Sequence, residues 1–228
     1  MISVCELIRT TDLCMDFKVG EETLSVLKNI SLSINRNKFT ILKGRSGSGK
    51  TTLINLLGAM SLPTSGNIIF DGKDITTLSP SEQDELRRTQ IGFVFQSGAL
   101  LPNMTLYENV EFALRVSRPE IKDRKERVNE CLKLVGLLKR ASHFPQELSG
   151  GEVQRAAIAR ALCPSPKVIF ADEPTSALDT LTALQVVKLF KDLIKEQDIT
   201  IVMTTHDPNM LEIADNVFAL EDGEIIHA

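Results

Sequence analysis

The stretch FTILKGRSGSGKTTLINLL, Phe39 to Leu57, joins an apolar run, a glycine-rich loop and an amphipathic segment. FTILK is short, apolar and followed by glycine, which is typical of a buried strand entering a loop. The segment after the loop is predicted to be a helix, because its large apolar residues recur at helical spacing. The residues expected on the buried face of that helix are Leu53, Leu56, Leu57 and Met60.

The loop between this strand and helix reads G-x-x-x-x-G-K-[ST] from Gly44 to Thr51. Glycines let backbone N–H groups curl around phosphate oxygens, and the start of a helix adds partial positive charge. Lys50 would add a full charge to the β- and γ-phosphates, and Thr51 would offer a hydroxyl to Mg²⁺. The alternative, a glycine turn with an incidental lysine, leaves the strand before and the helix after unexplained. The sequence therefore predicts a nucleotide site.

Outward from this loop, apolar strands alternate with helices. Strands are expected near Leu13–Val19, Ile30–Ile34, Lys167–Asp172 and Thr200–His206, and hairpin turns at Asp71-Gly72 and Asp222-Gly223. Near-continuous apolar strands separated by helices predict an α/β domain with a parallel sheet covered on both faces. The helix before Thr200 is expected to bury Leu184, Val187, Phe190 and Ile194.

The region from Leu100 to Glu147 is charged and helix-rich, with prolines as breaks, and reads as a helical insertion. Cys131 falls in a series at helical core spacing with Val128, Leu132 and Val135. The four cysteines form no metal-type pair and are expected to be reduced thiols.

The net charge and the hydropathy of the sequence argue against several classes of function. The formal net charge is −4, with 26 basic against 30 acidic residues, which argues against a general nucleic-acid binder. The first residues lack the basic start and apolar run of a signal peptide. No stretch approaches the roughly 20 apolar residues that cross a bilayer. A cytoplasmic protein is expected, with any membrane role supplied through a partner.

Two further stretches suggest chemistry. Asp172 and Glu173 follow an apolar strand, where a first carboxylate can hold a hydrated metal and a second can act as general base on water. LSGGE, Leu148 to Glu152, places Ser149, Gly150 and Gly151 at the start of a strongly helical run. It therefore predicts a second helix N-terminus able to bind an anion.

With Gly44–Thr51, Gln96, Leu148–Glu152, Val168–Glu173, Ser176–Asp179 and His206 in this order, the chain resembles an ATP-binding cassette (ABC) ATPase over nearly its whole length. The resemblance implies a phosphate-loop NTPase (RecA-like) core with a parallel sheet, an N-terminal antiparallel β subdomain and a helical insertion. The implied division is a nucleotide-binding core at residues 1–96 and 164–228, and a helical subdomain at 97–163. This subdomain contains LSGGE, Leu148 to Glu152, which is the signature motif of the family.

The resemblance also implies ATP and Mg²⁺ as ligands and a role for each matching residue. Glu173, His206, Gln96 and Lys50 would be catalytic, and Thr51, Gln96 and Asp172 would surround the metal. His206 would contact the γ-phosphate, and Asp179 would link two active sites. Besides an aromatic residue that would stack on adenine, the implied nucleotide contacts are Gly44, Arg45, Ser46, Gly47, Ser48, Gly49, Lys50, Thr51, Thr52, Ser149, Gly150, Gly151 and Asp179.

Relatives stack adenine on an aromatic residue upstream of the phosphate loop, and Phe17 is the candidate here. Phe17 also lies on the apolar face of its predicted strand, so an ordinary core phenylalanine is the alternative. Gln96, taken without the resemblance, is only a polar residue at a strand end.

The LSGGE of one subunit is expected to close over the phosphate held by another, in a head-to-tail dimer with itself or a homologous subunit. Within the family, Leu86–Leu114 is similar to the lipoprotein-release and macrolide-export branch, and also to a division-associated ATPase. This implies an integral membrane permease that holds the chain at the cytoplasmic face, for export or transmembrane mechanotransmission. An importer ATPase, or a division or signalling module that moves no substrate, stays open.

The resemblance also implies a groove for the permease beside the loop that carries Gln96. We expect Leu101, Met104, Leu106 and Tyr107 to line it, with simple insertion core as the alternative. A DNA-maintenance ATPase would need a long coiled coil between the phosphate loop and the signature, and the chain has no sustained heptads there. A translation factor would carry two tandem cassettes, whereas each motif occurs once.

Overall fold

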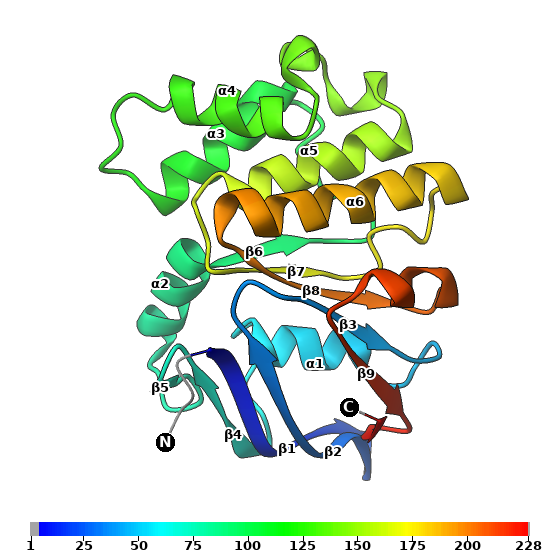
Figure 1. The fold of residues 1–228 in the computed structure, drawn as a ribbon. Coiled ribbons are helices and arrows are strands. Elements are labelled where there is room, and N and C mark those ends of the chain that lie inside the picture. The colour runs from blue at the N-terminus through cyan, green and yellow to red at the C-terminus, as the bar shows by residue number, and fades with distance from the viewer. Residues whose placement is uncertain (1–4, 228) are drawn as a thin grey trace. The chain divides into compact units, whose positions relative to one another are not determined.

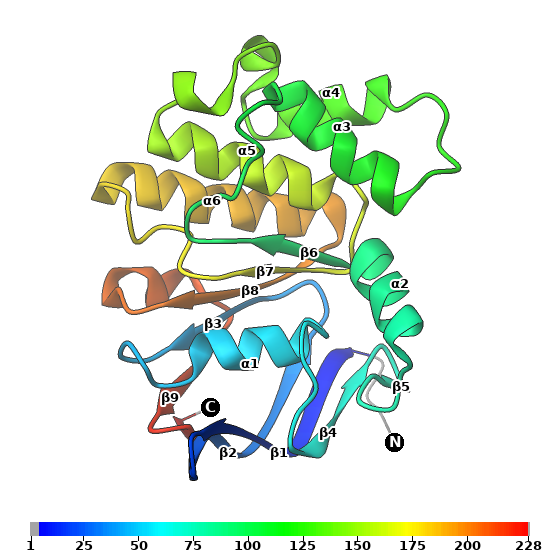
Figure 2. The ribbon, with the colours of Figure 1, turned by 180° about the vertical axis from the view of Figure 1, so that it is seen from behind.

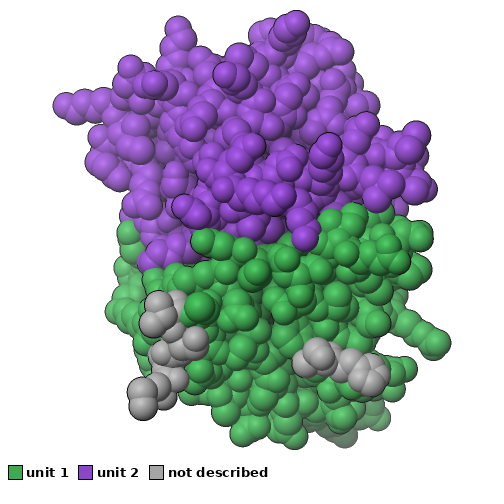
Figure 3. Space-filling model, viewed as in Figure 1, with its two compact units in different colours: residues 1–87, 202–228 green, residues 88–201 purple. Residues whose placement is uncertain are grey.

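The computed structural model describes residues 5–227, whose chain divides into two compact units. The first unit comprises residues 1–87 and 202–228, and the second comprises residues 88–201 (Figure 3). The predicted functional division at residues 96/97 and 163/164 differs from this grouping and stays a prediction.

The first unit begins with an antiparallel sheet in the strand order β2-β1-β4-β5. Its strands are β1 (Glu6–Val19), β2 (Glu22–Asn35), β4 (Ser65–Phe70) and β5 (Lys73–Asp74). Leu13 and Leu27 are fully buried, whereas residues near the β1–β2 turn are exposed. Figure 1 shows α1 (Lys50–Leu57) beside this sheet. The expected N-terminal antiparallel β subdomain is confirmed.

The same unit contains four further strands in the order β10-β9-β3-β8, and the glycine-rich loop follows β3. They are β3 (Phe39–Lys43), β8 (Thr200–Thr205), β9 (Asn216–Glu221) and β10 (Glu224–His227), with a short 3-10 helix, η3 (Pro208–Ile213), between β8 and β9. β3 runs parallel to β9, and β10 runs antiparallel to β9. Buried β3 and β8 match the expected near-continuous apolar strands.

Both predicted hairpin turns are present. Asp71 and Asp222 have φ of 49° and 47°, and the glycines after them have φ of 81° and 82°. Two consecutive positive φ angles are what a two-residue type I′ turn needs, which is why the Asp-Gly pairs were informative.

The prediction for Met60 is wrong. α1 ends at Leu57, and Ala59 has a positive φ of 54°, so the chain leaves the helix before Met60. Met60 is 49% exposed, whereas Leu53, Leu56 and Leu57 are buried as expected.

The second unit combines two parallel strands with helices. β6 (Ile91–Val94) pairs in parallel with β7 (Val168–Ala171). Helices α3 and α4 lie against α5, which also contacts β6 and α6 (Figure 2). The helices are α2 (Pro80–Gln90), which crosses the boundary of the units, α3 (Leu106–Ser117), α4 (Lys125–Leu134), η1 (Leu138–Arg140), η2 (Pro145–Glu147), α5 (Gly150–Leu162) and α6 (Thr180–Gln197).

The helical insertion and its core are confirmed: Val128, Cys131, Leu132 and Val135 are all buried. On α6 the buried face is rotated from the one expected. Val187, Phe190 and Ile194 are buried, but Leu184 is 37% exposed because Ala183 and Val186 occupy the buried positions of that turn. No helix within the described residues is long and apolar enough to cross a membrane.

Candidate functional site

The loop after β3 is shaped by its glycines. Gly47 and Gly49 have positive φ of 82° and 103°, a region that side-chain-bearing residues rarely adopt. Gly44 is required for space instead, since a Cβ there would lie 2.4 Å from the carbonyl oxygen of Leu220. The predicted succession of strand, glycine loop and helix is confirmed.

Lys50 lies over this loop at the first position of α1. Its side chain is 5% exposed, and Nζ donates to the carbonyl oxygens of Gly44 at 2.9 Å and Arg45 at 3.0 Å. The Ser48 hydroxyl is buried, and no described residue forms a hydrogen bond with it. A buried hydroxyl rarely stays without a partner. The loop therefore offers an ammonium group and an unused hydroxyl to an oxygen-rich ligand.

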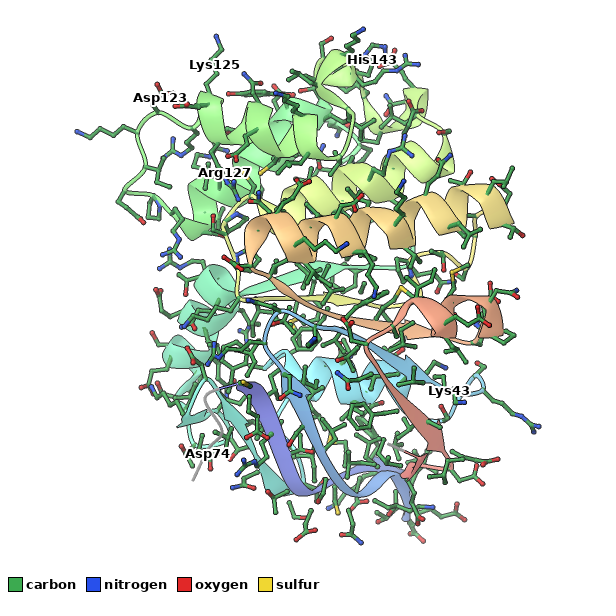
Figure 4. The ribbon with its side chains drawn as sticks, in the orientation of Figure 1. Lys43, Asp74, Asp123, Lys125, Arg127 and His143 are labelled. Atoms are coloured by element: carbon green, nitrogen blue, oxygen red, sulfur yellow. The ribbon has the colours of Figure 1, made fainter. Side chains whose placement is uncertain are left out.

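A hollow of about 520 Å³ opens at this loop. Loop residues line one part, and His206, Asp207 and the β9–β10 hairpin line the rest. Lys43, labelled in Figure 4, also lines it from the end of β3. His206 follows β8, so the sheet brings it beside a loop far away in the sequence. The volume and the mixed polar lining suit a small phosphorylated ligand.

In the second unit, the carboxylates and Gln96 follow neighbouring strand ends. Val94 of β6 lies opposite Ala171 of β7, and the Asp172 amide donates to the carbonyl of Val94 at 2.9 Å. Because the two strands are parallel, Gln96 and the Asp172-Glu173 pair leave the same edge of the sheet. The structure thus brings together three residues that the sequence singled out.

Glu173 has an unusual backbone. Its φ is 45°, in the left-handed region, although it is not a glycine. The amide and hydroxyl of Ser176 both donate to its carbonyl, at 3.2 Å and 3.0 Å. Non-glycine residues held in this region by the surrounding structure concentrate at functional sites.

The signature stretch opens α5 as predicted. Ser149 is the N-cap, its hydroxyl accepting from the Glu152 amide, while the Glu152 carboxylate accepts from the Ser149 amide at 3.0 Å. The amide and the hydroxyl of Ser149 both donate to the Glu152 carboxylate, and these two hydrogen bonds lower the pKa of Glu152. This capping box was not among the predictions, although the spacing Ser-x-x-Glu is its signal in a sequence.

A second hollow, of about 470 Å³, lies at this helix start. It is lined by Ser149–Glu152 and also by Asp179, the N-cap of α6, whose carboxylate accepts from the Thr182 amide at 3.1 Å. Two helix N-termini therefore open onto one hollow, and both bring partial positive charge. Arg155, which the sequence analysis did not single out, adds a cationic side chain to the lining.

Phe17 is not a core residue. It is 42% exposed and pairs with Leu24 near the β1–β2 turn, which removes the alternative of an ordinary core phenylalanine. It does not line the hollow at the phosphate loop. Its stacking role stays a prediction.

The predicted groove needs one correction. Leu106 is fully buried at the start of α3, so it cannot present its side chain to a partner. Leu101 is 41% exposed, and Met104 and Tyr107 are half-buried. Asn109, which the sequence analysis did not identify, is buried and donates to the carbonyls of Leu101 and Met104. It shapes the loop before α3.

Comparison with known proteins agrees with this geometry. The family described as ABC transporter matches residues 27–176. The ABC transporter ATP-binding protein YtrE of Bacillus subtilis is 44% identical over 206 residues, 90% of this chain and 89% of that protein. The macrolide export ATP-binding/permease protein MacB of Syntrophobacter fumaroxidans is 42% identical over 222 residues, which are 96% of this chain but 31% of that protein.

The chain thus spans about a third of the length of MacB and most of the length of YtrE. Among solved structures, the ATP-binding cassette MJ0796 of Methanocaldococcus jannaschii, a dimer in a post-hydrolysis state bound to ADP and Pi, superposes with a TM-score of 0.89. Its identity is 39%, and the match covers 97% of both chains. The phosphate loop, the signature helix and these matches together show that the chain belongs to the ABC transporter family, as an ATP-binding cassette ATPase.

Proposed function

We propose that the chain is the ATP-hydrolysing subunit of a membrane transporter, in which ATP-driven dimerisation powers a partner permease. The observation that carries this proposal is the pair of hollows, one at the phosphate loop and one at the signature helix. The first is lined by the loop that leads into α1, and the second by the N-termini of α5 and α6. Glycine-rich loops and helix N-termini are both suited to bind the phosphates of a nucleotide. In a two-fold dimer, the hollow at the phosphate loop of each chain would meet the hollow at the signature helix of its partner. Two ATP molecules would then hold the dimer together.

In the first unit, the residues Gly44–Thr52 would bind the phosphates, with Lys50 neutralising charge as the γ-phosphate leaves. The unused hydroxyl of Ser48 supports this assignment. His206 would contact the γ-phosphate, since it lines the same hollow. Phe17, exposed on β1, would stack on adenine.

In the second unit, Glu173 would orient the attacking water and accept its proton as the oxygen bonds to the γ-phosphorus and ADP leaves. Of the residues proposed for Mg²⁺, Asp172 and Gln96 of this unit offer a carboxylate and an amide oxygen, and Thr51 of the first unit offers a hydroxyl, all oxygen ligands that Mg²⁺ prefers. When bound, Mg²⁺ supplies positive charge to the β- and γ-phosphates. Ser149, Gly150, Gly151 and Asp179 would meet the partner's nucleotide.

ATP hydrolysis would be coupled to transport by a permease that contacts the segment after Gln96. This contact would also hold the chain at the cytoplasmic face of the membrane. Leu101, Met104 and Tyr107 remain the candidate contacts, because each side chain is at least partly exposed. Similarity to MacB, named for macrolide export, favours export or transmembrane mechanotransmission. Relatives of this size also include transporter ATPases whose names give no direction, so import is the second candidate.

The decisive experiment uses Glu173→Gln. This variant should bind ATP normally, release phosphate about 10²–10⁴ times more slowly, and elute as a dimer with ATP and Mg²⁺ but not with ADP. Turnover near the wild-type rate would remove Glu173 from the role of base.

The trapped variant then identifies the partner. Tagged Glu173→Gln chain is mixed with ATP, Mg²⁺ and detergent-solubilised native membranes, and the captured proteins are identified by mass spectrometry, with ADP as the control. A permease with a large extracytoplasmic domain supports export or mechanotransmission. A permease with a solute-binding protein indicates import. ATP-dependent capture of DNA or ribosomes instead would contradict the transport function.

A further inference from the structure

The residues that follow β6, Phe95 to Ala99, form a tight turn that carries Gln96. The Gly98 amide donates to the carbonyl of Phe95 at 2.9 Å. Gly98 and Ala99 then have positive φ of 70° and 46°, so two successive residues lie in the left-handed region. Ala99 is not a glycine, and such a conformation persists only where the surroundings hold it.

One part of those surroundings is Gln154 of α5. Its side chain is 4% exposed, and Nε2 donates to the backbone carbonyl of Gln96 and, at 3.5 Å, to that of Phe95. Its Oε1 is buried and forms no hydrogen bond with any described residue. The turn also lies tightly on the helix, because a Cβ at Gly98 would lie 2.7 Å from Cγ1 of Val153.

The other part is Arg160, which lies nearly two helical turns beyond Gln154 on α5. Its guanidinium donates to the carbonyls of both left-handed residues, Gly98 at 2.9 Å and Ala99. Burial lowers the pKa of Arg160, whose side chain is half-buried. Partial burial of a charged group costs free energy unless hydrogen bonds compensate for the lost water. The carbonyls of the strained turn supply two such hydrogen bonds.

We propose that Gln154 and Arg160 are positioning residues for Gln96. They attach its turn to α5, whose first residues are the signature Gly150 and Gly151, so that Gln96 follows any displacement of that helix start. Gln154 lies one helical turn after Gly151, within a continuous helix, which makes the connection short and stiff. This inference rests on the role proposed for Gln96 in ATP hydrolysis.

The same chain offers a matched control for the arginine. Arg127 of α4, labelled in Figure 4, donates to the carbonyls of Leu162 at 3.1 Å and Cys163 at 3.2 Å. It is therefore also a partly buried arginine that binds two backbone carbonyls against α5, but at the end of the helix away from the signature. A purely structural role for such arginines predicts similar consequences when either is replaced.

The experiment compares Gln154→Met, Arg160→Lys and Arg127→Lys, alone and in a Gln96→Ala background. Gln154→Met removes the unsatisfied Oε1 together with the amide donors, so the variant is expected to fold. Steady-state phosphate release gives kcat, titration calorimetry gives the Kd for ATP, and thermal melting reports folding. Arg160→Lys keeps the charge but loses the planar fork that binds two carbonyls.

We expect Gln154→Met and Arg160→Lys each to lower kcat at least tenfold, while the Kd for ATP changes less than about twofold. Arg127→Lys should leave kcat unchanged. In the Gln96→Ala background, Gln154→Met and Arg160→Lys should lower kcat no further, because their effect passes through Gln96.

Equal loss of kcat in Arg127→Lys, or equal factors with and without Gln96, would overturn the inference. If Arg160→Lys fails to fold, Gln154→Met decides by the same criteria. A normal kcat in Gln154→Met, beside a slowed Gln96→Ala, would refute the positioning role alone. A normal kcat in Gln96→Ala would overturn it together with the proposed role of Gln96.

Discussion

At the scale of single residues, the glycines of the two half-sites serve different physical needs. Gly47 and Gly49 permit left-handed backbone in the phosphate loop. Gly151, in contrast, has an ordinary helical backbone but no room for a side chain, because a Cβ would lie 2.3 Å from Cγ2 of Thr182. Sequence alone shows where glycine occurs, and the neighbours show why it is needed.

The proposed stacking of adenine on Phe17 can be tested directly. Stacking of a base on an aromatic ring is worth about 1–3 kcal/mol, so Phe17→Ala should weaken ATP binding by about five- to 150-fold. Phe17→Tyr should bind normally. Titration calorimetry checks both, with inorganic triphosphate as a ligand that lacks a base.

The control for this test is Val19→Ala, since Val19 is 62% exposed on the same strand. Equal weakening by Phe17→Ala and Val19→Ala, or equal loss of triphosphate binding, would contradict stacking by Phe17.

At the scale of elements, three helix starts are prepared in different ways. α1 begins after Gly49 without a side-chain cap. α5 and α6 are capped by Ser149 and Asp179, each of which accepts from an amide of its own helix. Uncapped amides suit close binding of a phosphate, whereas a capped start keeps its helix ordered before a ligand arrives.

The contact between α5 and α6 at Gly151 can be tested by a double-mutant cycle. Gly151→Ala should destabilise the fold by about 1–3 kcal/mol, the usual cost of overpacking. Thr182→Ser removes the obstructing methyl group and keeps the hydroxyl that donates to Asp179 at 2.6 Å. The double variant should therefore regain most of the lost stability in urea unfolding.

Strict additivity of Gly151→Ala and Thr182→Ser would contradict this steric account. Gly150→Ala is the control, since a Cβ there would lie 3.3 Å from Leu178, a milder contact.

The capping box of α5 predicts a pH dependence. Hydrogen bonds from Ser149 hold the pKa of Glu152 below its ordinary value of 4.5. A lowered folded-state pKa means that the carboxylate stabilises the fold above the unfolded value, and this contribution is lost as pH falls through the folded value. The urea midpoint of wild type should exceed that of Glu152→Gln at pH 7, and the difference should shrink below about pH 4.5.

A difference that stays constant from pH 7 to pH 3 would contradict this assignment. Glu126→Gln is the control, because Glu126 lies in the first turn of α4, where the N-cap residue Arg124 makes no side-chain cap hydrogen bond.

At the scale of the whole molecule, ATP should act as the adhesive of a dimer. A ligand at a hundred times its Kd stabilises a folded protein by about 2.7 kcal/mol, which raises Tm by about 5–10 °C for a chain of this size. With ATP and Mg²⁺, the Tm of Glu173→Gln should also rise with protein concentration, since dimerisation adds to binding.

Melting curves over a hundredfold range of protein concentration check this expectation, and ADP is the control. A Tm that ATP raises without any dependence on concentration would mean binding without dimerisation.

The features that were predicted correctly from the sequence are those that depend on neighbouring residues in the chain. The phosphate loop, the Asp-Gly hairpins and the start of α5 were predictable, because a turn or helix start depends on residues next to one another. The order of motifs was enough to indicate the family. Gln96 was grouped with Glu173 through the resemblance to the family, and the parallel pairing of β6 with β7 gives the physical reason why both leave the same edge of the sheet.

Only the tertiary structure decided which apolar faces are buried and what supports the site. Leu184 is partly exposed, although helical periodicity placed it on the buried face, and Leu106 is core, which was the alternative to its place in the groove. Gln154 and Arg160 bind carbonyls about sixty residues earlier in the chain, and no local pattern announces such contacts. Periodicity specifies the face of a helix only to within a turn, and burial depends on which distant segment packs against it.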